Sequence, residues 1–314
     1  MQGINVLSLF DGMSCGRLAL ERAGIKVNKY FSSEIDKHAI RVATENYPEN
    51  ILLGDVRHWR DWNLPKIDLI IGGSPCQGFS FSGKQLNFSD PRSKLFFEFV
   101  DILNYYTPKY FLLENVKMKK EYQDVISEKL GVEPIEINSA LVSAQNRVRL
   151  YWTNIPNVKQ PEDHGINLAD ILESDFEINP GAIRGRKLNK ATILGRRLNS
   201  EGKREDYNKE IPITQCLEVR ATNTNKSNCL TTVEKDNVLT PMPVGRHPDA
   251  FKNKLPFRYY TATEYERLQT VPEGYTASVS DSQRKKMLGN GWTVDVIVHI
   301  LKYMDVSQTS ANAN

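Results

Sequence analysis

The alternation of short apolar runs with amphipathic segments over the first 155 residues constrains the fold more than any other feature. Seven runs have the length and composition of strands, at residues 6–10, 30–33, 51–53, 67–71, 110–113, 135–141 and 149–155. Four intervening segments have the composition or apolar spacing of helices, at residues 17–23, 36–47, 94–106 and 121–130. Strands that alternate with helices predict an α/β fold with a doubly wound, mostly parallel sheet.

The alternation stops near Pro156, and helical spacing returns only at the C-terminus, where Val294, Ile297, Val298 and Leu301 share one face. From about 157 to 255, turn residues and basic residues dominate, and residues 222–228 are almost purely polar. We therefore predict a second, smaller domain with much irregular structure. Residues 157–281 are assigned to it, and residues 1–156 plus 282–314 to the large domain.

Charge and composition narrow the functional classes. The net charge is +3, but residues 184–209 contain nine basic and three acidic residues (9 − 3 = +6). Such a stretch is either a solvated loop or a contact for a polyanion such as nucleic acid. The sequence contains no apolar run of 18 residues and no signal-peptide pattern, so we expect a cytosolic protein without membrane contact. Its four cysteines form no Cys-x-x-Cys pair and its five histidines are scattered, so we expect free thiols and no metal site.

Polar residues follow the predicted strands, at the edge where open α/β sheets bind ligands. Gly12 and Gly16 follow the first strand without forming a Gly-x-Gly-x-x-Gly phosphate loop. Glu34 lies 22 residues after Gly12, close to the spacing at which a carboxylate holds a ribose in nucleotide-binding folds. Asp55 follows the third strand and is suited to accept from an adenine amino group. Together these loops indicate a nucleoside ligand without phosphates, such as S-adenosylmethionine, although the glycine loop alone would suit a plain turn.

Cys76 follows the fourth strand, within Gly72-Gly73-Ser74-Pro75-Cys76-Gln77. A cysteine after a strand is most often a small core residue. The glycines and Pro75 indicate a special backbone instead, and Glu114 ends the neighbouring strand, where burying a carboxylate is costly. This combination favours Cys76 as a nucleophile.

Six ordered motifs resemble those of the DNA (cytosine-5) methyltransferases of bacteria and phages. They are residues 9–16, residues 73–80, Glu114-Asn115-Val116, residues 145–151, residues 258–272 and Gly289-Asn290-Gly291. The resemblance covers nearly the whole chain except residues 157–255. It implies a Rossmann-like fold of S-adenosylmethionine-dependent methyltransferases, with residues 157–281 as the target-recognition domain. The chain departs from the family pattern at Ile35, where many members have an aromatic, and at Gly291-Trp292, where a serine usually follows the asparagine.

The resemblance also assigns roles to individual residues. Cys76 would attack carbon 6 of cytosine, Glu114 would act at ring N3, Arg149 would bind O2, and Arg147 would support the same site. S-adenosylmethionine would be bound by Phe10, Asp11, Gly12, Gly16, Glu34, Ile35, Asp55, Val56, Pro75 and Asn290. The partner would be duplex DNA with its cytosine flipped out, and residues 77–89 would form a lid over it. Arg220 is a candidate base or phosphate contact.

Further expectations concern the biological setting. We expect a monomer in the cytoplasm of a bacterium, or a phage-encoded protein, and a restriction endonuclease as a counterpart is compatible with the sequence. Two other functions stay open. A tRNA cytosine C5 methyltransferase has the same fold but tends to have other residues after the Pro-Cys pair. A catalytically silent DNA-binding partner would lack Cys76, Glu114, Arg147 or Arg149, all of which are present.

Overall fold

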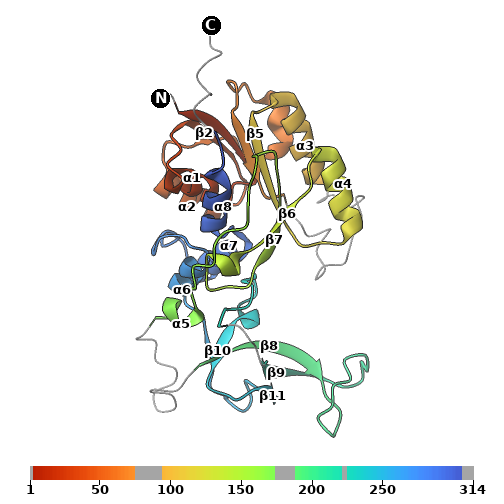
Figure 1. Cartoon of the computed structure of the whole chain (residues 1–314). Coiled ribbons are helices and arrows are strands. Elements are labelled where there is room, and N and C mark those ends of the chain that lie inside the picture. Colours follow the sequence, from red (N-terminus) through yellow and green to blue (C-terminus); the bar gives the residue numbers. More distant parts are fainter. Residues whose placement is uncertain (1–2, 75–93, 174–187, 221–224, 306–314) are drawn as a thin grey trace.

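The computed structural model describes residues 3–74, 94–173, 188–220 and 225–305. These residues form a large α/β unit and a smaller sheet below it in Figure 1, with α5 (Leu168–Ile171), α6 (Ala262–Leu268) and α7 (Asp281–Asn290) at the level between them. No helix among the described residues is long and apolar enough to cross a membrane.

The large sheet has seven strands in the order β3-β2-β1-β4-β5-β7-β6. Its strands are β1 (Ile4–Leu9), β2 (Val27–Ser33), β3 (Ile51–Leu52), β4 (Leu69–Gly72), β5 (Tyr110–Val116), β6 (Ile135–Asn138) and β7 (Val148–Thr153). The first five run parallel, whereas β7 is antiparallel to both of its neighbours. The predicted mostly parallel α/β sheet is therefore confirmed.

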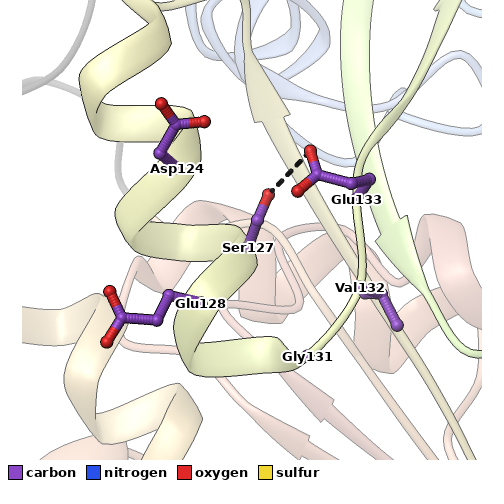
Figure 2. Close-up of a pocket in the computed structure, with 6 residues that line it drawn as sticks. All are labelled: Asp124, Ser127, Glu128, Gly131, Val132 and Glu133. Atoms are coloured by element: carbon purple, nitrogen blue, oxygen red, sulfur yellow. Dashed lines mark hydrogen bonds between the residues drawn. The ribbon is translucent and has the colours of Figure 1, made fainter.

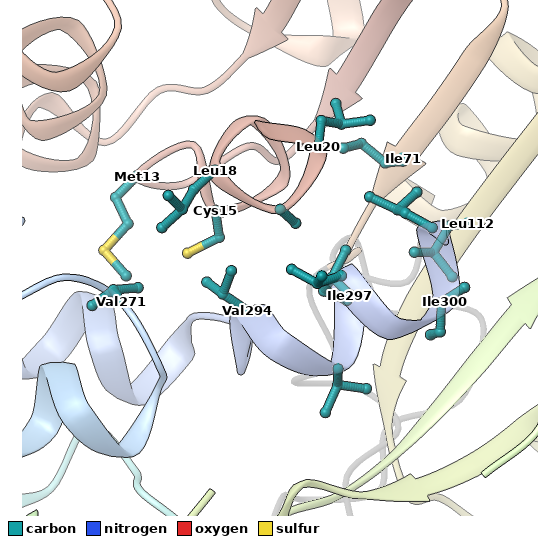
Figure 3. Packing of buried hydrophobic residues seen from close by; sticks show 14 of the residues in the cluster. Met13, Cys15, Leu18, Leu20, Ile71, Leu112, Val271, Val294, Ile297 and Ile300 are labelled. Atoms are coloured by element: carbon teal, nitrogen blue, oxygen red, sulfur yellow. The ribbon is translucent and has the colours of Figure 1, made fainter. Parts of the chain in front are cut away.

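Helices cover both faces of this sheet. Successive strand residues point to opposite sides, so the apolar residues on each face pack against a different set of helices. Leu69 and Ile71 face a cluster with α1 (Cys15–Arg22), α2 (Lys37–Asn46) and α8 (Val294–Leu301). Ile70 faces a second cluster with α3 (Lys94–Tyr106), α4 (Lys120–Leu130) and the short helix η1 (Val56–Asp61). Figure 3 shows α8 packed directly against α1, so the C-terminal helix completes the first cluster.

The small sheet is antiparallel, with the strand order β11-β9-β8-β10-β12. Its strands are β8 (Asn189–Arg197), β9 (Ile213–Val219), β10 (Val238–Thr240), β11 (Gly245–His247) and β12 (Arg258–Tyr259). The sequence analysis predicted much irregular structure in this region and did not predict this sheet. One face of the sheet is apolar and buried, with Ala191, Ile193, Leu217 and Val219, whereas the other carries the charged residues Arg196 and Glu218.

The chain returns from the small sheet to the large unit near residue 260. Tyr260, Tyr265, Leu268 and Tyr275 all belong to the cluster that contains α1 and α8. Residues 260–281 thus pack with the large unit, although the sequence assigned them to the recognition domain. We propose to draw the boundary between the domains near residue 260.

Candidate active site

The carboxyl ends of β1, β4 and β5 lie side by side in the sheet. The register aligns Leu9 with Gly72 and Gly72 with Leu113, so the segments that follow these three residues start at the same edge. Asn115 Nδ2 lies 3.4 Å from the Ser74 carbonyl oxygen and 3.3 Å from its Oγ, and both residues are buried. Pro75 and Cys76, as well as the predicted lid at 77–89, lie outside the described residues. The described chain thus leads up to the predicted nucleophile directly beside the end of β5.

Glu114 lies at the centre of this edge, with only 9% of its surface exposed. Its Oε1 is 3.0 Å from Nε of Arg149, and its Oε2 accepts a hydrogen bond of 3.1 Å from the Trp292 indole. The antiparallel register of β5 and β7 places Arg149 opposite Val116, diagonal to Glu114. Burial is the largest effect on Arg149 and disfavours its charged form, but Glu114, Cys229 and Tyr151 together outweigh it, so the pKa of Arg149 is raised. The pair therefore holds an ionised arginine against a buried carboxylate.

The sequence analysis grouped Arg147 with the catalytic residues, in a supporting role. Its guanidinium is buried and donates to the carbonyl oxygens of Leu230, Gly289 and Gly291, at 2.9, 3.1 and 2.8 Å. Burial, together with the charge of Arg149, lowers the pKa of Arg147. These bonds connect the residue before β7 to Leu230, near the end of the region between the large-unit segments, and to the last motif. Arg147 therefore stabilises the arrangement of the segments around the site. We propose it as a positioning residue rather than a substrate contact.

Two residues near Glu114 were not assigned to the site from the sequence. Trp292 was noted only as a departure from the family pattern, yet it donates to Glu114. A side chain on Gly73 would place its Cβ 3.0 Å from Trp292 Nε1 and 3.1 Å from Glu114 Oε2, so glycine keeps this contact open. Cys229 lies close by, with its Sγ 3.4 Å from Nη1 of Arg147 and 3.8 Å from Nη2 of Arg149. The position of Trp292 directly after the last motif was the available signal in the sequence.

The first loop and Glu34 form the predicted cofactor side of the edge. Phe10 and Gly12 adopt positive φ values of 57° and 61°, which turn the chain sharply after β1. Glu34 Oε2 accepts from the Gly12 amide at 2.8 Å, and its Oε1 accepts from the amides of Ile35 and Asp36 at 2.7 and 2.8 Å. The Ile35 side chain is 70% exposed beside this carboxylate. The loop thus presents an ordered carboxylate next to an uncovered apolar side chain.

Asp11 and Gly16 face the protein interior rather than the edge. The Asp11 carboxylate accepts hydrogen bonds from the hydroxyls of Ser8, Ser14 and Tyr30, at 2.5, 2.6 and 2.7 Å. Burial raises the pKa of Asp11 to about 6, although these hydroxyls oppose the shift. A Cβ on Gly16 would lie 2.3 Å from Ile71 Cδ1, so this glycine lets α1 approach the sheet. Both residues were assigned to the cofactor from the sequence, but their observed contacts stabilise the loop from its interior side.

The remaining predicted cofactor residues lie at the ends of β3 and α7. Asp55 accepts from the backbone amide of Arg57 at 2.9 Å and pairs with its guanidinium, which lowers the pKa of Asp55 to about 2. The side chain of Val56 is buried in the cluster around η1, which leaves its backbone for a ligand. Asn290 is exposed at the end of α7. Ser33 Oγ donates to the Gly54 carbonyl oxygen at 2.7 Å and ties the loops after β2 and β3 together.

A separate surface hollow lies at the end of α4 (Figure 2). Asp124, Ser127, Glu128, Gly131, Val132 and Glu133 line it, and Ser127 donates to Glu133 at 3.4 Å. It contains none of the predicted site residues. Its lining has three carboxylates and no cation, so the sheet edge remains the candidate site.

Comparison with known families identifies the family of this chain. The family model described as C-5 cytosine-specific DNA methylase matches residues 4–305. The chain belongs to this family. As a member of it, the methylase is an enzyme that methylates carbon 5 of cytosine in DNA.

Two relatives agree with this assignment, and two solved structures share the fold. The methylase is 31% identical to the type II methyltransferase M1.ScrFI of Lactococcus lactis subsp. cremoris, over 95% of this chain and 77% of that protein. It is 28% identical to the type II methyltransferase M.NlaX of Neisseria lactamica, over 98% of both. The methyltransferase EhMeth of Entamoeba histolytica has a TM-score of 0.67 at 18% identity, covering 96% of this chain and 98% of that chain. A DNMT2 mutant of Spodoptera frugiperda has a TM-score of 0.63 at 21% identity, covering 96% and 99%. At such low sequence identities, the two structures show that the fold is shared.

Proposed function

We propose that this methylase transfers a methyl group from S-adenosylmethionine to carbon 5 of a flipped-out cytosine in duplex DNA, through a covalent bond to Cys76. One observation carries the proposal. The Glu114 carboxylate is held between Arg149 and Trp292 at the end of β5, beside Ser74, where the chain leads to Cys76. An acid–base group and a cation are thus fixed beside Ser74, two residues before the predicted nucleophile in the sequence.

The chemistry explains why these groups belong together. Carbon 5 of cytosine is a poor nucleophile, but a thiolate that bonds to carbon 6 converts the ring to an enamine whose carbon 5 attacks an electrophilic methyl group. Glu114 shares a proton with N3 as charge develops there, and Arg149 donates to O2. A base then removes the proton from carbon 5, the electron pair re-forms the ring double bond, and the Cys76 thiolate leaves.

The cofactor side fits a nucleoside with an apolar ring face. Glu34 uses three of the four acceptor positions of its carboxylate on backbone amides, so one remains for a ribose hydroxyl. Ile35 offers an exposed apolar surface to the adenine. Asp55 would accept from the adenine amino group, because the Arg57 side chain that pairs with it is itself largely exposed and free to swing aside. S-adenosylmethionine supplies the electrophilic methyl group when bound.

Duplex DNA is the proposed substrate because the chain belongs to the DNA methylase family, and the reaction needs access to both faces of one cytosine. Carbon 6 is stacked within a duplex, so the base must leave the helix before a thiol can reach it. The small sheet and its flanking loops supply the second surface that would grip the DNA on the far side of the site (Figure 1). Monomeric state and an endonuclease counterpart remain expectations from the sequence.

A mechanism-based trap tests the covalent step. Duplex DNA synthesised with 5-fluorocytosine in place of cytosine is incubated with the protein and S-adenosylmethionine, and the mixture is resolved under denaturing conditions. A base cannot remove fluorine from carbon 5 as it removes a proton, so the bond between Cys76 and carbon 6 should persist and the native protein should stay attached to the DNA. Cys76→Ser should give no adduct and no methyl transfer, whereas Cys216→Ala, which changes a cysteine in the small sheet, should give both.

Two outcomes contradict the proposal. Undiminished methyl transfer by Cys76→Ser would exclude the covalent mechanism. Methylation of tRNA in preference to duplex DNA, measured by incorporation of a labelled methyl group, would replace the proposed substrate with RNA.

A further inference from the structure

Three arginines surround one carboxylate on the charged face of the small sheet. Glu218, in β9, lies 2.7 Å from Nε of Arg196, 3.3 Å from Nη2 of Arg220 and 3.2 Å from Nε of Arg246. The bond to Arg196 is the main reason that the pKa of Glu218 falls to about 2. The carboxylate is therefore ionised at any physiological pH, and it anchors three cations.

The three guanidinium groups differ in how much of each is already committed. Arg196 is 12% exposed, uses Nε and Nη2 on Glu218, and turns Nη1 to Asp206 at 3.5 Å. Arg220 is 75% exposed and holds Glu218 by a single nitrogen. Arg246 is 35% exposed and donates through Nε, so its two terminal nitrogens have no partner in the described part of the chain. Of the three arginines, only Arg246 has its Nε held by Glu218 and both terminal nitrogens available for a ligand.

The charged face is turned toward the large unit. Thr192 and Arg246 lie opposite Glu218 in the register of β8, β9 and β11, so their side chains share its face. On this face Thr192 Oγ1 donates to the carbonyl oxygen of Asp236 in η3 (Glu234–Asp236). The same short helix reaches α7, where Lys285 pairs with Glu234 at 3.3 Å. The arginines therefore lie on the side of the small sheet from which the chain contacts the catalytic unit.

We propose that Arg246, oriented by Glu218, reads a guanine of the target site in the major groove. This rests on the proposed function, since it assumes that the protein binds duplex DNA. Guanine presents two acceptors there, O6 and N7, at the spacing of the two terminal nitrogens of a guanidinium. Every duplex that contains a cytosine also contains a guanine. A carboxylate that holds Nε fixes the plane of the fork before binding, which lowers the entropy lost on contact.

Arg220 serves as an internal comparison. Its side chain is held at one nitrogen and is otherwise exposed, which suits a phosphate contact rather than base readout. Loss of a phosphate contact weakens binding for all sequences alike and reduces the salt dependence by about one ion. Loss of a base contact changes which sequences are accepted.

The experiment measures sequence preference and affinity separately. The native protein, with S-adenosylmethionine, methylates a library of random-sequence duplexes, and the modified cytosines are sequenced. We expect the native sites to share a guanine at a fixed distance from the methylated cytosine. Arg246→Ala should lower the preference for guanine at that one position by about 5- to 100-fold, as expected for a bidentate contact. Arg246→Lys, which keeps the charge but not the fork, should relax the same position. Arg220→Ala should leave the preferences intact and reduce the salt slope of binding.

The outcomes separate this proposal from the one on which it rests. Uniform loss of activity in Arg246→Ala and Arg246→Lys, with all sequence preferences retained, would overturn the guanine contact and indicate a phosphate contact. The proposed function would then stand, because the native protein still methylates a defined site. Absence of cytosine methylation by the native protein would overturn both. Thermal unfolding of each variant identifies any that fail to fold, and the lysine variant keeps the ion pair with Glu218.

Discussion

Replacing Trp292 with phenylalanine removes one of the two donors that hold the Glu114 carboxylate. The indole donates to Oε2 at 3.1 Å, and Arg149 holds the other oxygen at 3.0 Å. Phenylalanine keeps the aromatic packing against the α1–α8 cluster but has no N–H. The change therefore isolates a single hydrogen bond to a buried charged group.

The size of the expected effect follows from that bond. Hydrogen bonds to charged groups contribute about 1.5–3 kcal/mol. If this energy orients Glu114 toward the base in the transition state, its loss lowers kcat by roughly 10- to 150-fold, because each 1.36 kcal/mol changes the rate tenfold. The KM for S-adenosylmethionine should change little, since Glu34 and the first loop are untouched.

Single-turnover methylation of duplex DNA at saturating substrate measures this rate. Trp152→Phe is the matched control, because it removes another indole hydrogen bond in the large domain, the 3.0 Å bond to Ser127. That bond is buried away from Glu114, so the control should lose some stability and keep its kcat. An unchanged kcat in Trp292→Phe, or an equal loss in both variants, would refute the positioning role. A rise in the cofactor KM alone would assign Trp292 to cofactor binding instead.

Two further predictions concern stability. Arg258→Met should destabilise the protein by about 3–5 kcal/mol, because it leaves the fully buried Glu264 without the two 2.7 Å bonds from the guanidinium. Asp11→Asn should remove a pH dependence. The folded-state pKa of Asp11 is about 6 against an ordinary 3.8, so the folded state retains a proton that the unfolded chain loses between pH 4 and 6. The native free energy of unfolding should therefore fall by up to about 3 kcal/mol as pH rises through this window.

Urea unfolding measures both effects. For the first, Arg267→Met breaks a more exposed pair with Glu273 and one hydrogen bond to the Ile171 carbonyl oxygen, and should cost only about 1–2 kcal/mol, so equal losses in the two variants would contradict the argument from burial. For the second, the difference in free energy between native protein and Asp11→Asn is plotted against pH. A difference that stays flat from pH 4 to 6.5 would show that Asp11 ionises normally in the folded state.

The sequence predicted the large sheet well because its strands are buried on both faces and its helices are strongly patterned. The apolar runs around Ile70 and Leu112 need no tertiary information to be recognised as strands, and Gly131 ends its helix in the left-handed conformation as its residue type predicts. The small sheet was missed because the alternation of apolar and polar residues in β8 and β9 is broken on both faces. Leu194 and Cys216 lie on the charged face, and Gly195 and Gln215 lie on the apolar one.

The candidate site was predictable where a motif determines residue type and unpredictable where register determines contacts. Glu114 and Arg149 were each identified, but their pairing depends on β7 running antiparallel beside β5. Trp292 approaches Glu114 from 178 residues away. The inward turn of Asp11 depends on Tyr30, a residue of the next strand. A local sequence pattern cannot predict such contacts between residues that are far apart in the chain.

The packing of α8 against α1 has a consequence for how the protein is made. Val294, Ile297 and Ile300 are fully buried in a cluster whose other wall, α1, ends at Arg22, about 270 residues earlier in the chain. At a synthesis rate of about 5–20 residues per second, the nascent chain carries an uncovered apolar face for roughly 15–55 s. The inserted small sheet lengthens that interval. The synthesis of α8 is therefore the step that allows this cluster to be completed. Chains that end before Val294 should be recognised by chaperones rather than accumulate as folded protein.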